Sequence, residues 1–154
     1  MSICPRTLTL CLACFSLALL LFTGCTPKGS TPVVSASGTI LYNGEPVEGA
    51  MATFKPTSDG GRESGGLTNN KGKFLMMTAG ADKTGCVPGT YKVAISKQVM
   101  VDSRGNVVVP HEDLLDYRYK ELLPKKYLST ETSGLEVTVE RRGKNQFTFN
   151  LDDH

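Results

Sequence analysis

Hydrophobic and polar residues alternate with a period of two along most of the chain after Gly38. Apolar residues occupy every second position of 135–139 and 147–151, with polar residues between them, and the stretches 91–95 and 74–76 repeat this pattern. Successive side chains of a β-strand point to opposite faces, so the alternation predicts strands with one buried face.

Turn-forming residues separate these stretches. Asn43-Gly44 is a strong hairpin motif that joins the stretch ending at Tyr42 to a returning strand at 50–54. The segments 69–72 and 142–145 contain further Asn and Gly residues. We therefore predict six or seven short strands, with 135–139 and 147–151 forming a hairpin. A sheet with one apolar face must bury it, which predicts an antiparallel sandwich of two sheets. Its expected core contains the aromatic residues Phe54, Phe74, Tyr91, Phe147 and Phe149.

The order of these motifs resembles a known family. The segments that carry the resemblance are 37–50, 52–54, 68–74, 87–93, 123–127, 133–139 and 145–151. Together they resemble the carboxypeptidase-regulatory-like domain, and in particular small bacterial lipoproteins that carry one such domain. The resemblance spans Ser37 to Asp152 and implies an all-β fold, a seven-stranded antiparallel, transthyretin-like (prealbumin-like) β-sandwich.

The strand pattern fails between residues 100 and 133, which we interpret as an insertion before the last hairpin. Leu115, Tyr119 and Leu122 share one helical face ahead of Pro124, which predicts a short helix, and 107–109 is a candidate edge strand. The insertion is the expected interaction surface, with the candidate residues Tyr117, Tyr119, Tyr127, Arg118 and Lys125. The alternative is a helix that only covers one end of the sandwich.

The first 24 residues have the pattern of an export signal. Arg6 supplies a positive charge, the stretch 8–22 is mostly apolar, and small residues precede Cys25. The segment 22–25 resembles the bacterial lipobox, in which the cysteine receives a diacylglycerol before cleavage. This resemblance implies a signal peptide at 1–24 and lipidation at Cys25. The alternative is an ordinary secreted protein with a cysteine near its cleavage site.

Lipidation would attach the mature protein to a membrane of the cell envelope. Residues 25–37 are rich in Pro, Ser, Thr and Gly and predict a flexible tether, and residues 38–152 form the expected single domain. Thr26 stands where an Asp would resemble an inner-membrane retention signal, which slightly favours the outer membrane. Envelope proteins or glycans are the expected partners, besides the membrane itself.

Composition narrows the function further. The formal net charge of +2 at pH 7 gives no basic footprint for nucleic acid. Once the signal leaves and Cys25 is lipidated, Cys86 has no partner for an intramolecular disulfide, and we expect it to be a buried, unreactive thiol.

The sequence offers little for catalysis. Its two histidines are His111 and the terminal His154, and it contains no nucleophile elbow or phosphate-binding loop. A hydrolase with the transthyretin-like fold uses histidines of its strands, and this chain has none in a predicted strand. We therefore expect a non-catalytic envelope protein, without metal or cofactor, that has a structural, adhesive or protein-interaction role. The alternatives are a carbohydrate- or peptide-binding module and, less favoured, a hydrolase that uses His111.

Overall fold

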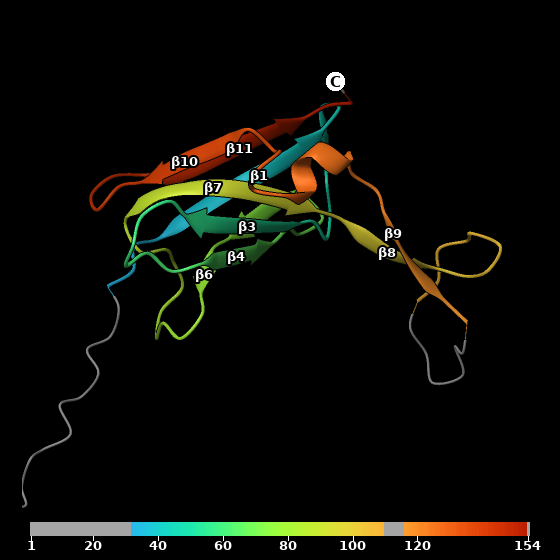
Figure 1. The fold of residues 1–154 in the computed structure, drawn as a ribbon, viewed down its shortest axis with the longest axis horizontal. Helices are drawn as coiled ribbons and strands as arrows, with labels where there is room; N and C mark the ends of the chain where they lie inside the picture. Colours follow the sequence, from blue (N-terminus) through green and yellow to red (C-terminus); the bar gives the residue numbers. More distant parts are fainter. Residues whose placement is uncertain (1–31, 110–115, 154) are drawn as a thin grey trace, which may run out of the picture.

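The computed structural model describes residues 32–109 and 116–153, and over these residues the protein is an all-β, sandwich-like fold. Two sheets share one core, and a separate hairpin extends from them (Figure 1).

The first sheet is built around the strand β1, which begins at Ala36 and ends at Tyr42. The strand β11 lies parallel to β1 on one side, and β2 and β5 lie antiparallel on the other. Their bounds are Asn145–Leu151 for β11, Glu45–Pro46 for β2 and Lys73–Leu75 for β5. Asn43 and Gly44 have φ values of 50° and 86°, as a two-residue hairpin between β1 and β2 requires, so the turn expected at this position is confirmed. The expected return at 50–54 is wrong, because only the short β2 pairs back onto β1 and residues 51–56 belong to the second sheet.

The second sheet is antiparallel throughout, in the order β10-β7-β3-β4-β6. Its strands are β3 (Met51–Pro56), β4 (Ser64–Leu67), β6 (Met77–Thr78), β7 (Gly89–Ser96) and β10 (Leu135–Val139). Only Met76 separates β5 of the first sheet from β6 of the second, so this stretch of chain crosses from one sheet to the other.

Two predictions about strand pairing are wrong. β10 and β11 do not form a hairpin, because β10 pairs with β7 and β11 pairs with β1 in the other sheet. The pair β1–β11 is also parallel, so the fold is not antiparallel throughout. Alternation of apolar and polar residues identifies the buried face of a strand but carries no information about which strand lies beside it.

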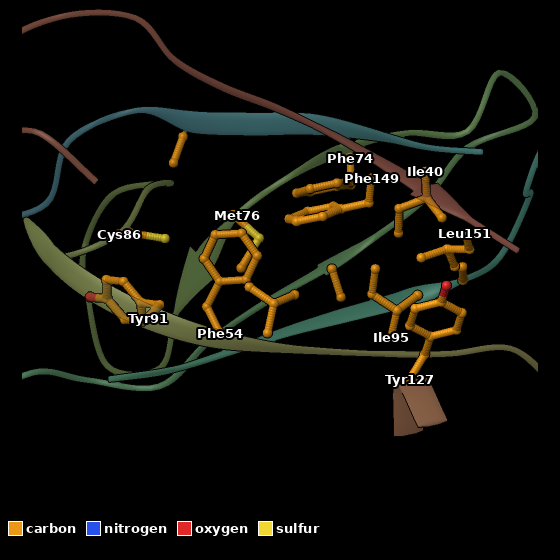
Figure 2. Packing of buried hydrophobic residues seen from close by; sticks show 14 of the residues in the cluster. Ile40, Phe54, Phe74, Met76, Cys86, Tyr91, Ile95, Tyr127, Phe149 and Leu151 are labelled. Carbon is orange, nitrogen blue, oxygen red and sulfur yellow. The ribbon is translucent and has the colours of Figure 1, made fainter. Parts of the chain in front are cut away.

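Aromatic rings from both sheets fill the core. Phe54 of β3 lies 6.4 Å from Phe74 of β5, 6.2 Å from Phe149 of β11 and 5.9 Å from Tyr91 of β7, measured between ring centroids. Figure 2 shows Phe54 facing the stacked rings of Phe74 and Phe149, with Met76 beside them. All the aromatic residues expected in the core contribute to it, although Phe147 is only partly buried.

One close approach explains a glycine in β1. A Cβ atom on Gly38 would lie 2.5 Å from the ring of Phe74 and 2.7 Å from the carbonyl oxygen of Phe147. Glycine therefore allows the Phe74 ring to pack directly against the backbone of β1.

A charged contact joins the segment before β10 to the second sheet. Glu131 accepts a hydrogen bond from the Ser129 hydroxyl, and its carboxylate lies 3.0 Å from Lys55 Nζ of β3. The Ser129 hydroxyl first, then Lys55 and Thr130, lower the pKa of Glu131 to about 2. The pair is exposed, so it positions the segment more than it stabilises the fold.

Candidate functional site

The strongest candidate for an interaction surface is a two-stranded arm that projects from the sandwich. It consists of β8 (Gln98–Val101) paired antiparallel with β9 (Arg118–Glu121), and Figure 1 shows it extending beyond the end of the two sheets. Val107 forms a bridge with Val101 on the other edge of β8, where an edge strand was expected. We call β8 and β9, together with the adjoining Tyr117, the arm.

The expected helix over Leu115 to Leu122 is wrong for the residues that the structure describes. Residues 118–121 form the strand β9, and the nearest helical turn within the described part of the chain is the short 3-10 helix η2 (Lys125–Leu128). Tyr117 and Tyr119 alternate with Arg118 and Lys120, so the local period is two, and pairing with β8 selects the strand.

Two tyrosines dominate one face of the arm. Tyr117 is 45 % exposed and Tyr119 is 63 % exposed, and their rings pack edge to face with centroids 5.9 Å apart. Met100 is the cross-strand partner of Tyr119 and therefore lies on the same face. This face presents two exposed aromatic rings beside the half-buried side chain of Met100.

The opposite face of the arm is cationic. Arg118 pairs with Val101 and Lys120 pairs with Val99, so both cations lie on the side away from Tyr119. Lys125 is exposed at the start of η2. The structure thus places four of the five proposed interaction residues in exposed positions on the arm or next to it.

Tyr127 does not belong to this surface. It is 5 % exposed and packs in the core, where Figure 2 shows it close to Ile95 and Leu151. Its hydroxyl accepts a hydrogen bond from the backbone N–H of Asp152 at 3.1 Å and lies 3.3 Å from Asp152 Oδ1. Proposing Tyr127 as an interaction residue was therefore wrong: it is a buried residue of η2 whose ring packs in the core and whose hydroxyl joins this turn to Asp152, just after β11.

The residues after β11 are tied to the domain. Asp152 forms an ion pair with Lys126 at 2.9 Å, and Asp153 accepts hydrogen bonds from the Tyr42 hydroxyl and from Asn43 Nδ2, the latter at 3.0 Å. The hydrogen bond to Asp153 raises the pKa of Tyr42. The chain up to Asp153 thus closes over the β1–β2 turn.

A carboxylate organises the root of the arm. Glu121 Oε1 accepts hydrogen bonds from the backbone N–H groups of Lys97 at 2.6 Å and of Leu122 and Leu123 at 3.2 Å each. Glu121 Oε2 is buried and has no hydrogen-bond partner among the described residues. Nothing in the sequence indicates this role, because the donors are backbone groups and the Lys97 N–H reaches the carboxylate only through the pairing of β8 with β9.

Cys86 is 0 % exposed, which confirms the expected burial of this thiol. Burial raises its pKa, while a hydrogen bond with Ser64 opposes the shift. A buried, protonated thiol is a poor nucleophile.

A second exposed surface was not anticipated from the sequence. Met51, Leu67, Leu75 and Met77 are between 41 % and 65 % exposed and belong to β3, β4, β5 and β6. Met51 pairs with Leu67, and Leu67, Leu75 and Met77 together line one open groove of about 750 Å³. We call these four residues the apolar patch. Phe74 and Met76 point into the core, so their neighbours Leu75 and Met77 must point outward. This alternation in the sequence could have predicted that Leu75 and Met77 are exposed.

Several predicted features lie outside the described residues. These are the signal segment, the lipidation site Cys25, both histidines and part of the insertion. Within 32–109 and 116–153, no group of three metal-ligating side chains comes together. Over the same ranges, no helix is both long and apolar enough to cross a bilayer.

Comparison with known proteins identified no relative. No family model, no curated protein and no solved structure matched the chain.

Proposed function

We propose that this chain is an exported, lipid-anchored protein of the bacterial cell envelope that acts by binding a partner protein and has no catalytic activity. The proposal of an anchor depends on the lipobox-like segment that ends at Cys25 and on the Pro/Ser/Thr/Gly-rich segment that follows it. The outer membrane remains slightly favoured over the inner membrane.

We propose that the domain itself is a transthyretin-like sandwich of the carboxypeptidase-regulatory-like type. If β5 and β6 are counted as one strand that crosses between the sheets, the sandwich has seven strands besides the short β2 and the arm. The Asn43-Gly44 turn, the glycine-mediated turn at 69–72 and the central strand β7 correspond to the motifs that carry the resemblance.

The single observation that carries the binding role is the tyrosine pair on the arm. Exposed, adjacent aromatic rings on a projecting element cost little conformational entropy on binding and bury a large apolar area, so such residues are frequent at the centres of interfaces. The arm offers these rings on one face and cations on the other, which would give a partner a defined orientation.

The arm itself supplies a matched pair of variants for the test. In the first, Tyr117 and Tyr119 are replaced by serine, and in the second, Arg118 and Lys120 are replaced by serine on the opposite face of the same strand. Each variant is expressed in the native envelope, cross-linked and purified. We expect the tyrosine variant to lose a stoichiometric partner that the wild type and the cation variant retain. Equal recovery from both variants would reject the arm as the binding surface.

The anchor is tested separately. Replacing Cys25 by serine should release the protein from the membrane fraction, and the intact mass of the wild type should correspond to a lipidated chain beginning at Cys25. An unmodified polypeptide beginning at another residue would disprove the anchor but leave the arm proposal intact. Separation of inner and outer membranes of the same cells tests the localisation.

Binding of a carbohydrate or a peptide is the second candidate function, because the 63 % exposed ring of Tyr119 could stack on a sugar ring. The chain contains no tryptophan and five tyrosines, so its intrinsic fluorescence reports on tyrosine directly. A saturable change in this fluorescence on titration with an envelope oligosaccharide, absent from the tyrosine variant, would favour a glycan ligand over a protein.

A further inference from the structure

Two residues of the apolar patch, Leu75 and Met77, lie beside the point where the chain enters the domain. Leu75 is the cross-strand partner of Ser37, and the backbone N–H of Met76 donates to the carbonyl oxygen of Ala36 at 2.9 Å. Met77 bridges to Thr84, and Val34 bridges to Cys86 in the same loop region. The residues that precede β1 therefore lie next to the patch.

The patch has the composition of a membrane-interface surface. Its leucine and methionine side chains are exposed on neighbouring strands, and Lys73 lies at the rim of the same groove. The rest of the groove includes small polar side chains of β1 and β11, such as Ser37, Thr39 and Thr148. A shallow apolar surface with a cation at its edge suits the boundary between headgroups and acyl chains.

Residues 34–37 of the predicted tether belong to the fold, because Val34 bridges to Cys86 and β1 begins at Ala36. The remaining length of the tether limits how far the patch can be from a bilayer. Seven peptide steps separate Cys25 from Pro32, the first described residue. Even fully extended, this segment reaches no more than about 25 Å. With a lipid on Cys25, which is the proposed function on which this step rests, the patch is held within reach of the membrane surface at a high effective concentration.

We infer that the apolar patch docks onto the lipid bilayer that carries the anchor and thereby gives the domain one orientation. The acyl chains supply the anchoring, and the patch determines which side of the domain faces the lipid. From Leu75, the arm begins beyond the opposite end of β1, about 20 Å away for a strand of this length, so docking through Leu75 and Met77 leaves its tyrosines clear of the lipid. Met51, the cross-strand partner of Ser96, lies nearer to the root of the arm. A second copy of the chain could cover the patch instead of the bilayer. The tether holds the patch close to the bilayer, however, and no such link holds a second copy close to the patch.

The test uses the full chain, purified with its lipid and reconstituted into vesicles of phosphatidylethanolamine and phosphatidylglycerol. A cysteine is introduced for a fluorescent label at Leu75 in one variant and at Tyr119 in a control variant; the two side chains are 61 % and 63 % exposed. Cys86 is fully buried and should not react. Quenching is measured with nitroxide-labelled lipid in the bilayer and with iodide in the water.

We expect nitroxide lipid to quench the label at position 75 several-fold more strongly than the label at position 119, and iodide to show the reverse order. Equal iodide quenching at both positions on vesicles that retain the protein would overturn the docking while the anchor stands. A label at 75 shielded from iodide but not quenched by nitroxide lipid would overturn it in favour of a second copy. Protein that does not float with the vesicles and carries no lipid would disprove the anchor, and the docking with it.

Discussion

Replacing Phe54 by alanine tests whether the two sheets are held together through a single ring. Phe54 is 0 % exposed, and of the four rings in contact with it, those of Phe74, Phe147 and Phe149 belong to the other sheet. Truncation of a buried phenylalanine costs about 3–5 kcal/mol through lost transfer energy and the cavity left behind. Aromatic pairs add about 0.5–1.5 kcal/mol each beyond their buried area, so we expect a loss in the upper half of this range, about 4–5 kcal/mol.

Urea unfolding of residues 26–154, followed by circular dichroism, measures this loss. With an m-value of about 2 kcal/mol per molar urea, the unfolding midpoint should fall by about 2 M. Thr53→Ala is the matched control, because Thr53 is the neighbour of Phe54 on the outward face of β3, and it should change the free energy of unfolding by less than about 1 kcal/mol. A loss below about 1.5 kcal/mol for Phe54→Ala, at an unchanged m-value, would refute the packing of the two sheets around this ring.

Three further predictions concern individual contacts. Gly38→Val should lower the free energy of unfolding, measured by thermal unfolding, by about 1–3 kcal/mol, because the added Cβ would overlap the Phe74 ring. Gly65→Ala is the control for this variant and should have little effect, because no neighbouring atom lies closer than 3.7 Å to its Cβ. Glu121→Ala should accelerate hydrogen exchange of the arm amides without an equal change in global stability, and Glu121→Gln, which keeps an acceptor oxygen, should have a smaller effect. The folded-state pKa of Glu131 is about 2, below its ordinary value of 4.5, so its stabilising contribution is present above pH 4.5 and is lost as the pH falls toward 2. Glu131→Gln should flatten this part of the stability–pH profile, and an unchanged profile would contradict the assigned contacts.

Local pattern predicts the strands of this protein well and their partners poorly. The alternation at 135–139 and 147–151 correctly identifies β10 and β11 and their buried faces. It cannot show that the chain between them crosses from one sheet to the other, because a hairpin and a crossover bury the same side chains. The Asn43-Gly44 turn was predicted correctly because its conformation depends only on the two residues in it.

The candidate site was also predictable only as far as it depends on local sequence. The sequence locates a cluster of tyrosines and cations in the insertion, but helical spacing of Leu115, Tyr119 and Leu122 suggested the wrong element. Tyr127 could not be separated from the exposed tyrosines, because its burial depends on η2 packing against the end of β11, a contact between distant parts of the chain.

We expect the two exposed surfaces to act separately, because β1 lies between the arm and the Leu75 end of the apolar patch. Leu75 of the patch is next to the start of β1, whereas Met51, the cross-strand partner of Ser96, lies nearer to the arm. The root of the arm lies beside Tyr42 at the end of β1, where Tyr42 and the arm root border a groove of about 340 Å³. If the patch sets orientation and the arm binds the partner, a patch variant such as Leu75→Ser keeps its affinity for the partner in detergent but binds less of it on membranes. The tyrosine variant instead loses affinity in both settings. A patch variant that loses affinity in detergent as well would show that both surfaces belong to one interface.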